Sequence, residues 1–212
     1  MTIKATSLLS ILAIWIASIG AVVADSGSWW LLVFSVLTTG AVGASAWRRL
    51  GISRVIAIAG TWGATGLAAG SDPGATWVGV FAFLTTSAVV YSTMKRDAWL
   101  NGVGIAVAWG AVGAAVLEHG AGPAWMSIFA FLTAGAVANS MGELGRGLAA
   151  VIWWGAAGLI VVAAGAGWAW LGVIAFLLTT LSLGVGSFSF PSGIEWDLWD
   201  RDGDDERVKI VR

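Results

Sequence analysis

The stretches "WGATG" (Trp62 to Gly66), "WGAVG" (Trp109 to Gly113) and "WGAAG" (Trp154 to Gly158) are three copies of one motif. Their tryptophans are 47 and 45 residues apart (109 − 62 and 154 − 109), and a fixed period of this length is typical of a tandem repeat. An earlier stretch, "WIASIG" from Trp15, resembles the motif but departs from it. The motif therefore divides the chain into units, and these units decide the fold.

The composition indicates a membrane environment. Of the 212 residues, 58% are hydrophobic and 11% are charged, and the mean hydropathy is +0.86. Soluble domains carry about 25% charged residues, so this chain has too few to cover a water-facing surface. Its charged residues fall in clusters, and the apolar segments between the clusters are long enough for transmembrane helices.

Aligning the chain with itself gives four units, at about residues 5–50, 51–97, 98–145 and 146–188. Each unit has an apolar stretch, a short break rich in Gly, Asp or Pro, and a second apolar stretch such as "WVGVFAFLTT" from Trp77. Because the break residues favour turns, each unit is predicted to be a helical hairpin. The expected protein is an all-α integral membrane protein with eight transmembrane helices in four tandem parallel hairpins. They form one domain, residues 1–188, followed by a short cytoplasmic tail, residues 189–212.

The charged residues predict the orientation in the membrane. All 11 Lys and Arg residues lie at the termini or between hairpins, whereas the hairpin tips carry only Asp25, Asp72, Glu118 and His119. Basic residues in short loops stay cytoplasmic, so a multi-pass protein of the cell membrane with both termini cytoplasmic is expected. The apolar segment near residues 5–24 fits the repeat and is interpreted as a membrane helix instead of a cleaved signal peptide.

Tryptophans and threonines recur at one depth. Trp62 precedes its hairpin tip and the pair Thr85 and Thr86 follows it, each at a separation that places it about 15–20 Å below the outer end. An indole N–H in hydrocarbon needs an acceptor, and a threonine on the partner helix is a suitable one. Neighbouring glycines let helices approach closely. The candidate packing or cavity residues are Trp15, Trp62, Trp109, Trp154, Thr38, Thr85, Thr133 and Thr179.

Several classes of chemistry are disfavoured. No ionisable side chain falls in the middle of the eight predicted segments, which argues against a proton pump, a proton-coupled carrier and a voltage sensor. The chain has no cysteine, and its single histidine, His119, is interpreted as a solvated loop residue. No basic stripe for nucleic acid is found. We therefore expect no catalytic residues, no metal and no cofactor.

The tail "FPSGIEWDLWDRDGDDERVKIVR" (190–212) alternates apolar and polar residues on both sides of Asp202-Gly203, which predicts a short β-hairpin. Such a hairpin is marginal alone, so Trp196 and Trp199 are candidate residues for docking a protein partner.

Three functions remain from the sequence. The first is a non-enzymatic structural or accessory membrane subunit, with the lipid bilayer, a protein partner at the tail or further copies of itself as partners. The second is a passive channel for a small neutral solute, lined by a ring of the mid-membrane threonines and tryptophans. The third is a binder of a flat apolar ligand, such as a quinone or carotenoid, between the mid-membrane indoles.

Overall fold

A computed structural model describes residues 5–45, 50–92, 94, 99–139 and 144–182 of the chain. Every regular element in these residues is helical, as expected for long apolar runs without interior proline. The tail, with its predicted β-hairpin and with Trp196 and Trp199, lies outside the described residues.

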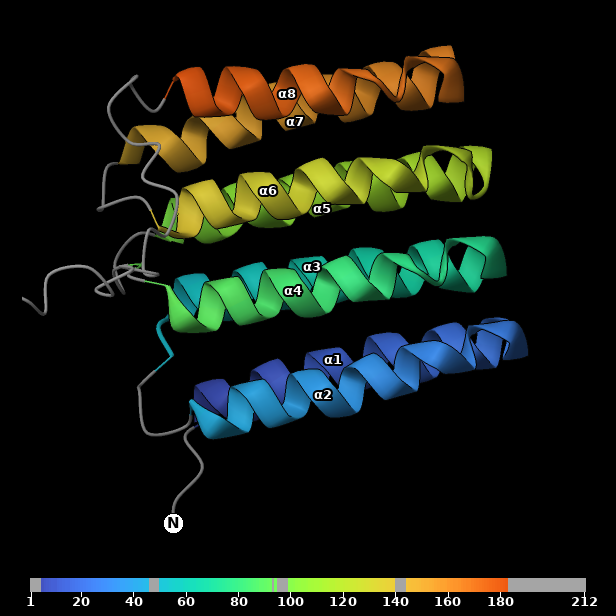
Figure 1. Cartoon of the computed structure of the whole chain (residues 1–212), viewed down its shortest axis with the longest axis vertical. Helices are drawn as coiled ribbons and strands as arrows, with labels where there is room; N and C mark the ends of the chain where they lie inside the picture. The colour runs from blue at the N-terminus through green and yellow to red at the C-terminus, as the bar shows by residue number, and fades with distance from the viewer. Residues whose placement is uncertain (1–4, 46–49, 93, 95–98, 140–143, 183–212) are drawn as a thin grey trace, which may run out of the picture.

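Eight α-helices alternate with short 3₁₀ turns in the described residues. The α-helices are α1 (Ala5–Ala24), α2 (Trp30–Ala44), α3 (Ile52–Ser71), α4 (Val78–Tyr91), α5 (Trp99–His119), α6 (Met126–Ala138), α7 (Leu144–Ala164) and α8 (Leu171–Leu181). The turns are η1 (Ser26–Trp29), η2 (Pro73–Ala75), η3 (Gly122–Trp125) and η4 (Ala166–Trp168). Each turn joins an odd-numbered helix to the next even-numbered helix, which lies alongside it (Figure 1). We number these helix pairs 1 to 4 in chain order.

The first two turns begin with an aspartate that caps them. The Asp25 carboxylate accepts a hydrogen bond from Gly27 N at 2.7 Å, and the Asp72 carboxylate accepts one from Gly74 N at 2.8 Å. Aspartate is favoured at this position because its side chain satisfies a backbone N–H that has no partner within the helix.

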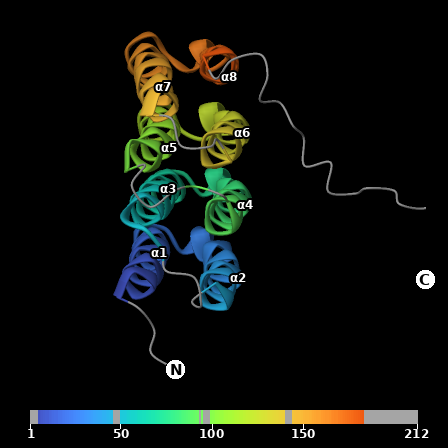
Figure 2. The ribbon, with the colours of Figure 1, turned by 90° about the vertical axis from the view of Figure 1, so that its left-hand side faces the viewer.

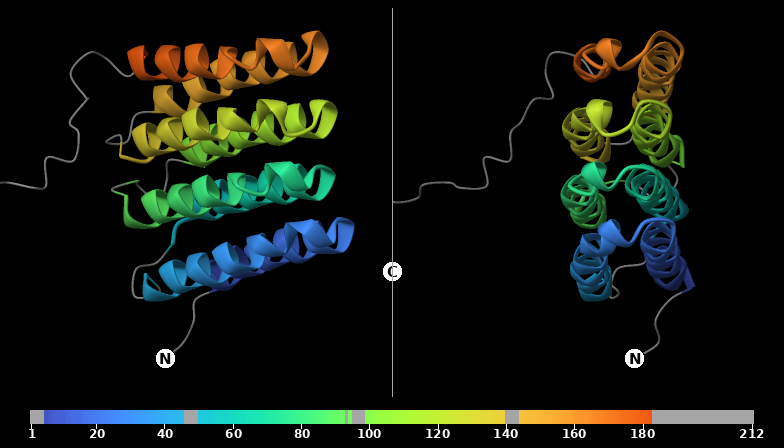
Figure 3. Two further views of the ribbon diagram at one scale, coloured as in Figure 1. Left: turned by 45° about the vertical axis from the view of Figure 1, so that its right-hand side comes forward. Right: turned by 90° about the vertical axis from the view of Figure 1, so that its right-hand side faces the viewer.

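The four pairs stand in a row, two layers thick. Helices α1, α3, α5 and α7 form one layer and α2, α4, α6 and α8 form the other, as Figures 2 and 3 show. All four connecting turns lie along the same side of the row, at the right in Figure 1. The sequence left open whether the units close into a ring, and the structure answers that they do not.

Glycine and alanine of the recurring motif make the contact between consecutive pairs. A Cβ added to Gly66 would lie 2.7 Å from the carbonyl oxygen of Ala17, and one added to Gly158 would lie 2.7 Å from the Cβ of Ala111. A Cβ on Gly113 would lie 3.0 Å from the Ala64 carbonyl oxygen. The last glycine of each motif therefore removes the side chain where one odd-numbered helix touches the previous one.

The position of pair 1 at one end of the row explains why its motif departs from the others. Ile19 of α1 occupies the position of Gly66, Gly113 and Gly158, and it is 51% exposed. Among the described helices none packs on this side of α1, so this position does not need glycine.

Five segments are long and apolar enough to cross a membrane, which indicates a membrane protein. They are Ala5–Ala24, Ser26–Ala44, Ile52–Ser71, Trp99–His119 and Gly147–Ala164. The segments Val78–Tyr91, Gly122–Ala138 and Ala166–Leu181 are apolar but shorter.

Candidate functional site

The indoles of the motif lie in the interior of the row. Trp62, Trp109 and Trp154 are fully buried, and Trp15 at the end of the row is partly buried. Around them the core is built from small residues, largely alanine, so the indoles are its bulkiest side chains.

Two indoles bond to a threonine of their own pair, but the acceptor is the residue after the candidate threonine, Thr39 instead of Thr38 and Thr86 instead of Thr85. Trp15 Nε1 donates to Thr39 Oγ1 at 3.1 Å, and Trp62 Nε1 donates to Thr86 Oγ1 at 3.0 Å. Each bond joins the two layers and satisfies a donor that has no access to water.

The other two indoles differ from the expectation. Trp154 Nε1 donates at 3.0 Å to Thr133 Oγ1, which belongs to the previous pair, and Trp109 Nε1 has no hydrogen-bond partner among the described residues. The sequence gives the reason for Trp109, because the third copy reads "FLTA" where the second reads "FLTT". Ala134 therefore replaces the threonine that would accept from this indole.

The four candidate threonines are buried but do not surround a common axis. Thr38, Thr133 and Thr179 each donate to a carbonyl oxygen four residues earlier in the same helix, at 2.7 to 2.8 Å. Thr85 Oγ1 has no hydrogen-bond partner in the part of the chain that the structure describes. Because the pairs stand in a row, these hydroxyls are distributed along it, one in each even-numbered helix.

A second set of polar contacts joins the pairs at the helix ends that carry the turns. Asp72 Oδ2 accepts a hydrogen bond from Ala121 N of the next pair at 2.7 Å. His119 Nε2 lies 2.9 Å from the Val161 carbonyl oxygen, so this nitrogen carries a hydrogen and donates to the pair after it. The interpretation of His119 as a solvated loop residue missed this contact, since the sequence does not show which helix lies beside the tip.

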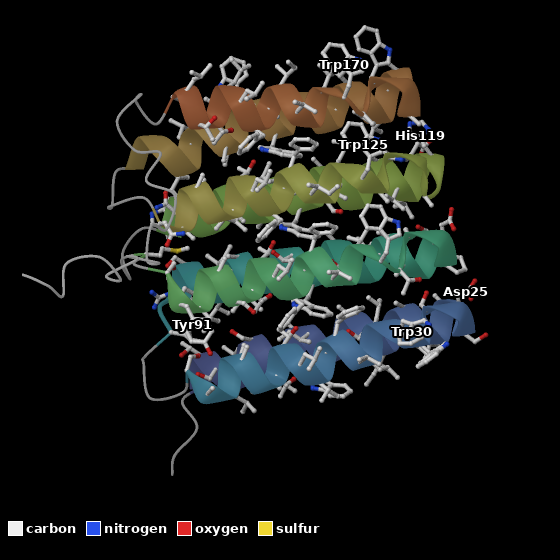
Figure 4. The ribbon with its side chains drawn as sticks, viewed as in Figure 1. Asp25, Trp30, Tyr91, His119, Trp125 and Trp170 are labelled. Atoms are coloured by element: carbon white, nitrogen blue, oxygen red, sulfur yellow. The ribbon has the colours of Figure 1, made fainter. Side chains whose placement is uncertain are left out.

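Figure 4 shows the distribution of these groups along the helices. Asp25 and His119 lie at the end with the turns, near Trp30, Trp125 and Trp170, and Tyr91 lies at the opposite end. At that opposite end Arg54 Nη2 donates to the carbonyl oxygens of Ser92 and Met94.

An apolar groove of about 600 Å³ is lined mainly by residues of α5 and α7. Its lining includes Val107, Gly110, Ala111, Trp154, Gly155 and Gly158. A Cβ on Gly110 would meet no atom within 4 Å, so this glycine is not required by contacts within the chain. In the described residues no group of three His, Asp or Glu side chains is arranged to hold a metal ion.

The sequence matches no protein-family model, and neither a curated protein nor a solved structure matches it.

Proposed function

We propose that the chain is a non-enzymatic accessory protein of the cell membrane, a rigid slab that crosses the bilayer eight times and holds a cytoplasmic tail for a protein partner. The observation that carries this proposal is the glycine–alanine contact repeated between consecutive pairs, such as Gly66 with Ala17. Backbones in direct contact along the whole row have little freedom to slide or open, which suits a scaffold.

The pairing of the helices supports the proposal of eight crossings. The shorter α4, α6 and α8 run alongside the longer α3, α5 and α7. If the long helix of a pair crosses the bilayer, its partner must return to the starting side. Acidic Asp25 and Asp72 at the turns and Arg54 at the opposite end support placing the turns outside and both termini in the cytoplasm.

Cysteine labelling tests this topology, because the natural chain contains no cysteine. Ser26→Cys, in the first turn, should react with a membrane-impermeant maleimide on intact cells, and Lys95→Cys should react only after lysis. The reverse pattern would contradict the orientation.

Partner docking is tested by affinity purification of the full chain and of a Trp196→Ala/Trp199→Ala variant. The proposal expects proteins that co-purify with the first and are lost from the second. Trp168→Ala/Trp170→Ala is a matched control, since these two tryptophans lie at the end with the turns. An unchanged set of co-purifying proteins in the tail variant would remove the docking role.

The groove on α5 and α7 favours a second candidate function, the binding of an apolar molecule. It differs from the sequence-based expectation of a ligand between the indoles, because Trp154 is the one motif tryptophan in its lining. Purified protein should then release a quinone, carotenoid or lipid on solvent extraction, and Gly110→Leu should reduce the amount released. The row offers no comparable support for the ring-shaped channel.

A further inference from the structure

Near the middle of the helices, the interface between pairs 2 and 3 contains three buried polar side chains whose polar atoms have no partner among the described residues. They are Thr61 of α3, Thr85 of α4 and Trp109 of α5, each at most 1% exposed. The unpaired atoms are the two threonine Oγ1 atoms and the indole Nε1. Leaving a buried polar atom unpaired is destabilising, so three such atoms close together require an explanation.

The three side chains lie at one depth. A Cβ on Gly60 would clash with the Cβ of Ala106, and one on Gly113 would lie 3.1 Å from the Cβ of Ala64. These contacts bracket Thr61 on α3 and Trp109 on α5. Thr85 shares this depth because its neighbour Thr86 accepts the hydrogen bond of Trp62, the residue after Thr61.

They also face the same space. At the next interface Trp154 reaches back to Thr133 of the previous pair. In the repeat Trp109 corresponds to Trp154 and Thr85 corresponds to Thr133, so Trp109 and Thr85 face each other across the interface between pairs 2 and 3. Thr61 is buried on the helix that forms the third side of this space.

The third hydroxyl is specific to this interface. The position of Thr61, immediately before the motif tryptophan, is Ile14 in the first unit and Ala108 in the third. The other two interfaces therefore lack a hydroxyl here, and each of their indoles has a threonine acceptor.

The sequence also makes room beside Trp109. Ala134 stands where Thr39 and Thr86 stand next to their indoles, and alanine lacks the hydroxyl and the methyl group of threonine. Two missing heavy atoms leave space comparable to one water molecule, which needs two to four polar partners to be held in a protein interior.

We propose that one water molecule binds between pairs 2 and 3, accepting a hydrogen bond from Trp109 Nε1 and donating to the hydroxyl oxygens of Thr61 and Thr85. It satisfies all three atoms at once and replaces the threonine hydroxyl that the third unit lacks. The site is internal and joins three helices of two pairs.

Nuclear magnetic resonance of the full chain in lipid nanodiscs, with ¹⁵N-labelled tryptophan, tests the site. Trp109→Phe assigns the indole signal by its loss. The proposal expects magnetisation transfer from water to the Trp109 indole N–H and none to those of Trp62 and Trp154. A Trp109 signal with no transfer from water, like these two, would overturn the site.

Substitution at Ala134 gives a second, independent test. Ala134→Thr should supply the acceptor found in pairs 1 and 2, abolish the transfer from water and shift the Trp109 indole signal towards that of Trp62. Ala134→Val adds the same number of atoms without a hydroxyl, so it should abolish the transfer without that shift. Transfer that persists in both variants would show that the water reaching Trp109 is not held at this position.

Thr85→Val and Thr61→Val remove single partners, and each should reduce the transfer several-fold. Thr133→Val is the matched control at the neighbouring interface and should leave the Trp109 signal unchanged. Equal effects of Thr133→Val and Thr85→Val would contradict the assignment of the three partners.

Discussion

Ala17 and Gly66 are in backbone contact across the interface of pairs 1 and 2, so closely that a Cβ on Gly66 would lie 2.7 Å from the Ala17 carbonyl oxygen. The same relationship recurs between Ala64 and Gly113 and between Ala111 and Gly158. Three repeats of one contact mean that the alanine of one motif is the surface on which the glycine of the next motif packs.

This contact predicts different effects for two glycines of one motif. Gly66→Ala should destabilise the protein by about 1–3 kcal/mol, the cost of overpacking, because the new methyl group meets backbone that cannot rotate away. Gly63→Ala is the control, since a Cβ there meets nothing within 4 Å, and it should be neutral or stabilising by up to about 1 kcal/mol through helix propensity. Unfolding in mixed detergent micelles, followed by circular dichroism, measures both. Equal losses in the two variants would contradict the packing account.

The hydrogen bond between Trp62 and Thr86 should show measurable coupling. Thr86→Val, Trp62→Phe and the double variant form a double-mutant cycle. We expect a coupling energy of about 0.5–1 kcal/mol, within the range found for hydrogen bonds between membrane helices. Thr179→Val is the matched control, because the Thr179 hydroxyl bonds only to the Ala175 carbonyl oxygen of its own helix. Its coupling with Trp154→Phe should be close to zero.

Substitution of Asp72 should affect the neighbouring pair, whereas substitution of Asp25 should affect only its own turn. Asp72 bonds both its own turn and Ala121 N of the next pair, whereas the bond of Asp25 is to Gly27 N in its own turn. Asp72→Ala should therefore raise amide hydrogen exchange at Ala121 about tenfold or more, since a bond worth roughly 1.4 kcal/mol or more is lost. Mass spectrometry of the turn peptides provides the measurement. Faster exchange at Ala121 in Asp25→Ala would count against a direct link.

The two end faces of the row should resist association because bulky residues cover them. Ile19 replaces the motif glycine at one end, and Ile160 at the other end occupies the position of Ala21, Ala68 and Ala115. An Ile19→Gly/Ile160→Ala variant should therefore form dimers or longer assemblies in nanodiscs at a higher proportion than the natural chain, because small residues permit close helix contact. Energy transfer between labelled copies reports this. Leu159→Ala, which shortens an exposed residue on another face, should have no such effect.

The sequence predicted where the helices lie along the chain better than it predicted which helices lie side by side. Apolar length and turn residues were sufficient for α1, expected near residues 5–24 and found at Ala5–Ala24. The same features predicted that the indoles and the threonines lie at similar depths along the helices. Lateral position depends on side-chain contacts, so the sequence could not show whether Trp154 turns to Thr179 of its own pair or to Thr133 of the previous one. The contact of His119 with α7 could not be predicted from the sequence for the same reason.

A row in which the extensive contacts join consecutive pairs has no closing interface between its first and last members. Its resistance to denaturation is then a sum of local contributions, and cooperativity weakens with distance along the row. Such an architecture comes apart progressively from its extremities, and it can gain or lose a whole repeat during evolution without redesign of the remainder.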